Sequence, residues 1–216
     1  MTRITDTMNT LSFGIEIETV ELGTAATALA VHRALGNTGN YFDRRRISMN
    51  DGTGRHFKVV TDCSLSYNGA EIVSPILTAS DIPKLQEVVR AVRAAGGRVN
   101  DSCGIHIHVD GAALDGKSMR NLIKTCKAKE ELFEHALGIT DRAHDGGWCQ
   151  RSPLYTVEAI SAQRTPTHSS ILNQWPTTRY MGLNLRALQR HGTVEFRWFH
   201  STLHAGRVKA YIQFIL

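Results

Sequence analysis

Alternation of apolar and charged residues constrains the fold of this chain more than any other feature. Residues 12–20, SFGIEIETV, place three apolar side chains on one side of an extended chain and Glu16 and Glu18 on the other. Successive side chains of a β-strand point to opposite faces of a sheet. The segment therefore predicts a strand with one buried apolar face and one acidic face.

Four further segments predict strands of the same kind. Residues 104–110 (GIHIHVD), 180–186 and 193–198 alternate in the same way, and residues 71–75 (EIVSP) form a short strand that a proline closes. Chemically reactive side chains occupy the polar faces of these five strands: Glu16, Glu18, Glu71, His106, His108, Asp110, Asn184, Arg186, Glu195 and Arg197. If these faces converge, several carboxylates become crowded, and a bound cation would keep them ionised. The strands therefore predict a metal site.

The types of residue on these faces narrow the chemistry. Carboxylate oxygens favour Mg²⁺, which is often shared with substrate phosphates, and a histidine ligand also admits Mn²⁺. Zinc stays open, although the HExxH pattern is absent and the four cysteines form no CxxC pair. Arginine binds phosphate oxygens through two parallel hydrogen bonds. Acids, a metal and arginines together indicate phosphoryl chemistry.

Helices are expected between the strands. Helical periodicity predicts them over 24–35, 80–95 and 117–137, with Thr24 and Ser80 as the N-caps of the first two.

Three other segments complete the outline. Residues 41–62 contain an Asn-Asp-Gly turn and predict a hairpin, and residues 206–216 look helical. Residues 141–178 gather glycines and prolines, which predicts a mostly irregular loop and a candidate lid. Trp148 and Trp175 in this loop could cover a site or serve as ordinary core anchors.

Composition sets broad limits. The 216 residues, 42% hydrophobic and 21% charged, predict a single globular domain over 1–216. A net charge of +5 suits a phosphate-bearing partner; it does not indicate nucleic acid, which stays open. The polar first ten residues and the lack of a long apolar run predict a cytoplasmic protein without membrane contact. The oligomeric state, and whether the C-terminus is truncated, stay open.

Several motifs, in their order along the chain, resemble those of the amidoligases. These enzymes are relatives of glutamine synthetase and glutamate–cysteine ligase among the carboxylate–amine ligases. The resemblance is carried by FGIEIE (13–18), DCS followed by EIVSP (62–75), GIHIHVD (104–110), and RYMGLNL followed by GTVEFRWF (179–199). It implies an α+β fold, in which an antiparallel sheet is curved into a glutamine synthetase-like half-barrel and helices pack on one face.

The resemblance also implies a ligand set. Glu16 and Glu18 would serve two separate metal sites. Glu71 would bind the metal of Glu18, whereas His106 and Glu195 would share the metal of Glu16. Each of these five residues lies on a predicted strand and has a carboxylate oxygen or an imidazole nitrogen that can bind a metal.

Phosphate contacts follow from the same resemblance. Arg197 would contact the transferred phosphate, and Arg179 and Arg186 would contact phosphate or substrate. His108 would be a phosphate contact or would support a ligand, and Asp62 would be a ligand or a substrate binder.

Structural alternatives stand beside these roles. Arg197 could pair with Glu195 on the same strand face. Asp62 and Asp110 could be ordinary turn or strand-end residues.

The function implied is ATP-dependent joining of a carboxylate to an amine through an acyl phosphate, with Mg²⁺ or Mn²⁺ and with Glu195 and Arg197 as catalytic residues. The partners would be a small-molecule or peptide acid and an amine. A guanidino-kinase-like phosphotransferase, a non-catalytic nucleotide- or metal-binding module and a metal-dependent hydrolase are the alternatives.

Overall fold

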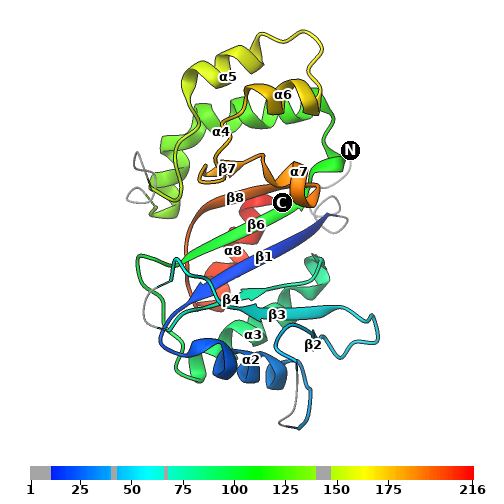
Figure 1. Cartoon of the computed structure of the whole chain (residues 1–216), viewed down its shortest axis with the longest axis vertical. Helices are drawn as coiled ribbons and strands as arrows, with labels where there is room; N and C mark the ends of the chain where they lie inside the picture. Colours follow the sequence, from blue (N-terminus) through cyan, green and yellow to red (C-terminus); the bar gives the residue numbers. More distant parts are fainter. Residues whose placement is uncertain (1–10, 40–42, 66–67, 140–146) are drawn as a thin grey trace. The chain divides into compact units, whose positions relative to one another are not determined.

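The computed structural model describes residues 11–39, 43–65, 68–139 and 147–216 (Figure 1). The chain divides into two compact units. The first unit comprises residues 1–107 and 200–216, and the second comprises residues 108–199. Whether they act as the single catalytic domain expected from the sequence stays a prediction.

The first unit contains an antiparallel sheet. Its strands are β1 (Ser12–Thr19), β2 (Ile47–Ser48), β3 (His56–Val60), β4 (Ala70–Val73), β5 (Leu77–Thr78) and the first part of β6 (Gly104–Asp110). They follow the order β2-β3-β4-β1-β6, and β5 pairs with β1. The pairings of β1 with β4 and β5, and of β3 with β2 and β4, are antiparallel.

Strand β1 confirms the predicted alternation. Phe13, Ile15 and Ile17 are at most 2% exposed, and Glu16 lies between them on the more open face. Complete burial of one such apolar side chain stabilises a fold by about 1.5–3 kcal/mol. A one-residue change of register would expose all three, so the hydrophobic pattern also sets the position of the acids.

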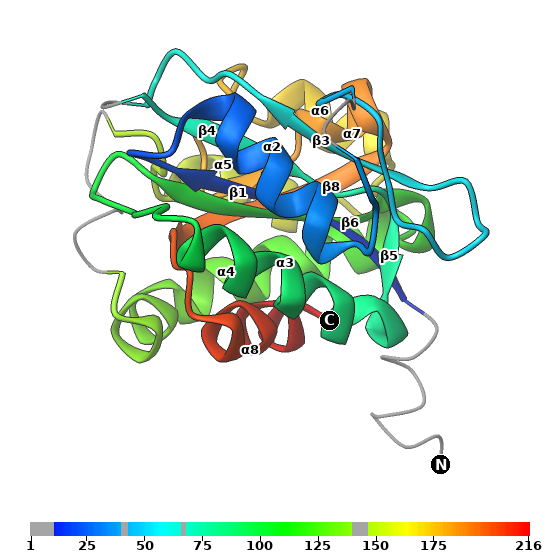
Figure 2. The ribbon, with the colours of Figure 1, turned by 90° about the horizontal axis from the view of Figure 1, so that it is seen from below.

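The described part of the first unit contains three α-helices: α2 (Gly23–Ala34), α3 (Ile82–Ala94) and α8 (Ala205–Ile215). Helix α2 packs against α3 and against β3 and β4, and α3 packs against α8 (Figure 2). The C-terminal segment is therefore helical, as its pattern predicts.

Both predicted N-caps are wrong. Leu22 occupies the N-cap of α2, and the hydroxyl of Thr24 accepts a hydrogen bond from Arg44 instead. Ser80 lies in a 3₁₀ turn before α3, where the carboxylate of Asp81 accepts from the backbone N–H of Thr78 at 2.9 Å. Hydroxyl side chains that can cap a helix also serve as partners elsewhere, so their position alone did not identify the cap.

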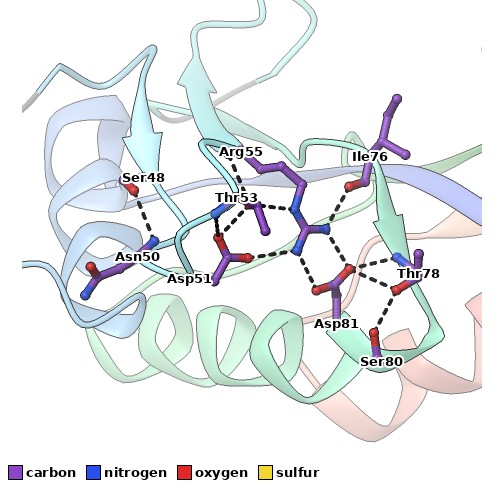
Figure 3. A network of polar contacts seen from close by, with 9 residues as sticks. All are labelled: Ser48, Asn50, Asp51, Thr53, Arg55, Ile76, Thr78, Ser80 and Asp81. Carbon is purple, nitrogen blue, oxygen red and sulfur yellow. Dashed lines mark hydrogen bonds and ion pairs between the residues drawn. The ribbon is translucent and has the colours of Figure 1, made fainter.

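Arg55 ties the loop between β2 and β3 to the start of α3 (Figure 3). Its guanidinium donates to both carboxylate oxygens of Asp81, at 2.7 and 2.9 Å, and to Asp51 at 2.8 Å. A further bond of 3.1 Å reaches the carbonyl of Ile76. The planar guanidinium thus connects the loop, the segment before β5 and the 3₁₀ turn that precedes α3.

The same contacts lower the pKa of both carboxyl groups. Hydrogen bonds from Arg55 and then from Thr78 lower the pKa of Asp81. Hydrogen bonds from Thr53, followed by those from Arg55, lower the pKa of Asp51 to about 2. Both carboxyl groups are therefore ionised at neutral pH.

The second unit holds the rest of β6 with β7 (Leu183–Asn184) and most of β8 (Thr193–His200), in the order β6-β8-β7. Strands β7 and β8 are antiparallel and pair Asn184 with Glu195. The predicted strand over 180–186 is therefore much shorter than expected.

The helices of the second unit are α4 (Gly116–Leu137), α5 (Leu154–Ser161), α6 (His168–Gln174) and α7 (Ala187–His191). Helix α4 confirms the helix predicted over 117–137: the side chain of Asp115 caps its start, and Gly138 ends it with a φ of 65°. That left-handed conformation costs glycine little because it has no Cβ. Within the described ranges, no helix has both the length and the apolar content needed to cross a membrane.

The mostly irregular loop predicted over 141–178 contains two helices in its described part. Helices α5 and α6 lie within residues 147–178 and pack on α4 and on each other. They have 8 and 7 residues, so neither is long enough to show a clear helical period in the sequence. Residues 141–146, and the Tyr41 end of the predicted hairpin, lie outside the described residues.

Candidate metal and phosphate site

Three carboxylates gather in the first unit. Each of Glu18, Asp62 and Glu71 offers an oxygen, and these oxygens all lie within 4.8 Å of one another. The pairing of β1 with β4 sets Glu18 directly opposite Glu71. Asp62 joins them because it follows β3, whose Val60 is also opposite Glu71. The register of three neighbouring strands thus builds the cluster, which is called the carboxylate cluster below.

The oxygen atoms of the carboxylate cluster are ligands of the type that a hard divalent cation prefers. Like charges directly opposite each other on two strands destabilise a sheet. Glu18 is only 5% exposed, and the backbone N–H of Gly104 donates a short hydrogen bond to it. This bond fixes the position of one of the three carboxylates. Oxygen ligands at this density fit Mg²⁺ or Mn²⁺.

His106 lies beside Glu16 and Glu18 in the same unit. Its Nδ1 is 2.9 Å from the Oε2 of Glu16, and its Nε2 is 3.9 Å from the Oε1 of Glu18. The histidine is 4% exposed. A carboxylate at one ring nitrogen orients the other nitrogen, which is the arrangement found around metal-binding histidines. His106 and Glu16 are therefore in contact, and a metal shared between them stays a prediction.

A second group of polar side chains lies in the second unit around Glu195, which is 5% exposed. The guanidinium of Arg197 donates to one carboxylate oxygen at 2.6 Å, and the amide of Asn184 donates to the other at 2.6 Å. The Nε2 of His108 is 3.9 Å from Glu195, and its Nδ1 is 3.0 Å from the hydroxyl of Thr193. The pairing of Arg197 with Glu195, an alternative that the sequence left open, is therefore present.

The other expected phosphate contacts have different surroundings. Arg186 donates to the backbone carbonyls of Pro176 and Trp175, at 2.8 Å for the first, and so fixes the chain before β7. Arg179 is exposed, with its guanidinium carbon 5.3 Å from the ring centre of Tyr180. A role of either arginine in phosphate binding stays a prediction.

Asp110 occupies the place of a structural residue. Its carboxylate accepts from the backbone N–H of Ala112 at 2.9 Å and so caps the short turn after β6. Asp62 also stabilises a turn through Ser64, at 2.7 Å, yet it belongs to the carboxylate cluster. Asp62 can therefore stabilise the turn and also offer an oxygen to the carboxylate cluster.

Sequence reasoning missed two kinds of polar partner. Thr193, the partner of His108, lies on the same strand face as Glu195, so the alternation of β8 could have identified it. Glu130 and Glu134 of α4 are buried, at 7% and 3% exposure, although they look like solvent-facing acids in the sequence.

These buried acids anchor the chain that precedes α5. Arg151 donates to both oxygens of Glu134, at 2.8 Å through its Nε, and the backbone N–H of Ser152 donates to Glu130 at 3.0 Å. Their partners lie about twenty residues away, beyond the reach of any local pattern.

Comparison with protein-family models supplies the deciding observation. A model described as "putative amidoligase enzyme" matches residues 9–216. This chain belongs to that family. The description of the family is that of a ligase-type enzyme. The matched residues include both groups of polar side chains. Searches of curated proteins and of solved structures gave no match.

Proposed function

We propose that this amidoligase-family chain is an ATP-dependent carboxylate–amine ligase that uses Mg²⁺. The observation that carries the proposal is the carboxylate cluster, in which Glu18 and Glu71 are paired across two strands and Asp62 lies within reach of both. Ion binding would offset the repulsion between these acids. The finer fold assignment, a glutamine synthetase-like half-barrel, belongs to the same proposal.

The residues of the first unit would bind the metal and orient the nucleotide. Glu18, Asp62 and Glu71 supply oxygen ligands, and the N–H of Gly104 holds Glu18 in place. His106, with Glu16 at one ring nitrogen, would provide a second ligand group in this unit. When bound, Mg²⁺ neutralises the phosphate oxygens of ATP and so makes the terminal phosphorus open to attack.

The proposed reaction balances in two steps. An oxygen of the substrate carboxylate attacks the γ-phosphorus of ATP, the bond from that phosphorus to the bridging oxygen breaks, and ADP leaves. The amine nitrogen then attacks the carbonyl carbon of the acyl phosphate. The bond from that carbon to the phosphate oxygen breaks, the nitrogen loses a proton, and the products are an amide and inorganic phosphate.

Arg197 is the residue of the second unit proposed to stabilise the transferred phosphate. A guanidinium carries five N–H donors, so it can bind a carboxylate and a phosphate oxygen at the same time. Arg197 is only 9% exposed. This burial would strengthen such an interaction, because the effective dielectric constant is lower inside the protein than in bulk water. Glu195 would hold the guanidinium in this orientation.

The segment over residues 147–178 remains the proposed lid, now with two helices in it. Trp148 is 54% exposed and stacks edge-to-face on Tyr180, with ring centres 4.8 Å apart. Trp175, by contrast, is 2% exposed and is a core residue, so only Trp148 is proposed to exclude water.

The test is nucleotide turnover with a mixture of small-molecule and peptide acids and amines. We expect release of ADP and phosphate that requires Mg²⁺ and an amine, together with a new amide detected by mass spectrometry. Glu195→Gln and Glu18→Gln should abolish turnover while the circular dichroism spectrum stays unchanged. Glu87→Gln, a change of an exposed acid on α3, is the matched control.

The products distinguish the proposal from its alternatives. Phosphate retained on a guanidine product would show a phosphotransferase, and turnover without nucleotide would show a hydrolase. Binding of ATP and metal without turnover of any substrate mixture would show a binding module. Equal activity in Glu18→Gln and Glu87→Gln would contradict the role of the carboxylate cluster.

A further inference from the structure

An open pocket of about 1130 Å³ lies in the first unit, apart from the carboxylate cluster. The last turns of α3, the chain after it and the start of α8 form its walls. The lining residues are Arg90, Arg93, Ala94, Gly97, Arg98, Val99, Thr202, Leu203, His204, Ala205, Gly206 and Arg207. None of them is acidic. This space is called the arginine pocket below.

Four exposed arginines give the arginine pocket a strong positive charge: Arg90, Arg93, Arg98 and Arg207. Among the described residues, the ion pairs of this protein involve other cations, and no carboxylate lies within 4 Å of these four guanidiniums. Among the same residues, the only hydrogen bond from a side chain of these four arginines joins Arg98 to the carbonyl of Gly97, at 2.9 Å. The described residues therefore do not balance this positive charge.

The position of Arg207 is informative because it runs against helix electrostatics. Arg93, in the last turn of α3, lies at the negative end of a helix dipole, where a cation is stabilised. Arg207 lies in the first turn of α8, at the positive end, and this turn contains no acid. A cation there is unfavourable by itself, and an anion between Arg207 and the helix end would reverse the sign of the interaction.

The walls of the pocket are held in place by backbone hydrogen bonds. The carbonyl of Arg98 accepts from the N–H of Val20 at 2.9 Å, and the N–H of Arg98 donates to the carbonyl of Val20 at 3.1 Å. On the other side, the hydroxyl of Thr202 accepts from the N–H of His204 at 3.1 Å, and the His204 ring accepts from the N–H of Arg207 at 3.1 Å. Gly206 has no Cβ, so a ligand can approach the backbone of the first turn closely.

We propose that the arginine pocket binds a small molecule carrying several linked phosphates. Planar guanidiniums match phosphate oxygens in pairs, and a helix start with glycine provides N–H donors of the same type. Four positive charges correspond to a chain of phosphates more closely than to a single anion. The volume is at the upper end of small-molecule sites and far exceeds that of one phosphate.

The test uses inorganic tripolyphosphate in EDTA, so that no metal can carry it to the carboxylate cluster. Binding is measured by calorimetry at two salt concentrations. Arg93→Ala/Arg207→Ala should weaken binding at least tenfold, and its control, Arg33→Ala/Arg45→Ala, removes two exposed arginines that do not line the pocket. The control should bind within twofold of the wild-type protein.

A second pair of variants separates the pocket from a general change in charge. Ala94→Glu adds an acid to the lining, whereas Ala95→Glu adds the same acid to the next exposed residue, which does not line the pocket. Only Ala94→Glu should weaken binding tenfold or more. Equal effects of the two substitutions, or no binding of tripolyphosphate by the wild-type protein, would overturn the proposal.

Two further ligands check the chemical class. Citrate bound as tightly as tripolyphosphate would show a carboxylate site, and a single-stranded oligonucleotide that binds more tightly as it lengthens would show a nucleic-acid surface; either result overturns the proposal. Binding of ADP in EDTA, lost in Ala94→Glu, would support it and would assign a nucleotide as the source of the phosphates. Glu18→Gln should leave tripolyphosphate binding unchanged, so failure of the ligase proposal would leave this result intact.

Discussion

Replacement of Glu71 by glutamine should change stability in opposite directions with and without metal. The substitution removes one charge from the pair Glu18–Glu71 and preserves the size of the side chain. Like charges opposite each other on strands cost about 0.2–1 kcal/mol, so the metal-free variant should gain about that much unfolding free energy. With a saturating metal the order should reverse, because a site filled at a hundred times its Kd stabilises the wild-type protein by about 2.7 kcal/mol.

The assay is urea unfolding in EDTA and in millimolar Mg²⁺, for the wild-type protein, Glu71→Gln and the control Glu87→Gln. The informative quantity is the difference in unfolding free energy between the two conditions. We expect Mg²⁺ to raise the unfolding free energy of the wild-type protein and of Glu87→Gln. The rise should be smaller for Glu71→Gln and should correspond to a Kd for Mg²⁺ at least tenfold higher. If Mg²⁺ stabilises all three proteins equally, the carboxylate cluster is not its binding site.

Three further predictions concern stability and reactivity. Asp81→Asn should destabilise the first unit by about 1–2 kcal/mol at pH 7, since a charge-assisted bond is lost. The pKa of Asp81 is lowered in the folded state, so the difference in unfolding free energy between the wild-type protein and Asp81→Asn should be complete above the ordinary pKa of 3.8. The difference should disappear as the pH falls further, and unfolding at several pH values will measure it. Arg151→Ala should cost about 1–3 kcal/mol in thermal unfolding, because Glu134 stays buried without this partner, and Glu134→Gln in the same background should recover part of the loss. In the native protein a thiol reagent at pH 8 should modify Cys63, which is exposed, and spare Cys126, whose pKa burial raises to about 12; equal labelling by mass spectrometry would contradict this.

Strand faces were predictable from the sequence because alternation has a period of two residues and leaves little freedom. The positions of Glu16, Glu18 and His106 follow from the burial of the isoleucines between them. Pairing of Glu18 with Glu71 was not predictable in this way, because it depends on which strands become neighbours and in what register. The family resemblance supplied that relation.

Elements that depend on distant contacts were the ones missed. Helix α6 has seven residues, too few for a clear hydrophobic period, and it is stabilised by packing on α4 and α5. The bond from Arg186 to the carbonyl of Pro176, ten residues earlier, is a second contact that no local pattern indicates. A guanidinium can bind a backbone carbonyl as well as a phosphate, so residue type alone did not predict this contact.

The two groups of polar side chains differ in their charge balance, and this difference bears on their roles. The carboxylate cluster brings together three acids, whereas Glu195 already has a cationic partner in Arg197 and an amide partner in Asn184. A carboxylate with both oxygens engaged must give up a hydrogen bond to bind a metal, so its metal affinity is reduced by the strength of that bond. The carboxylate cluster is therefore the stronger candidate for resident metal. Glu195 is better suited to hold Arg197 until phosphate arrives, which would make its contribution visible in turnover more than in metal affinity.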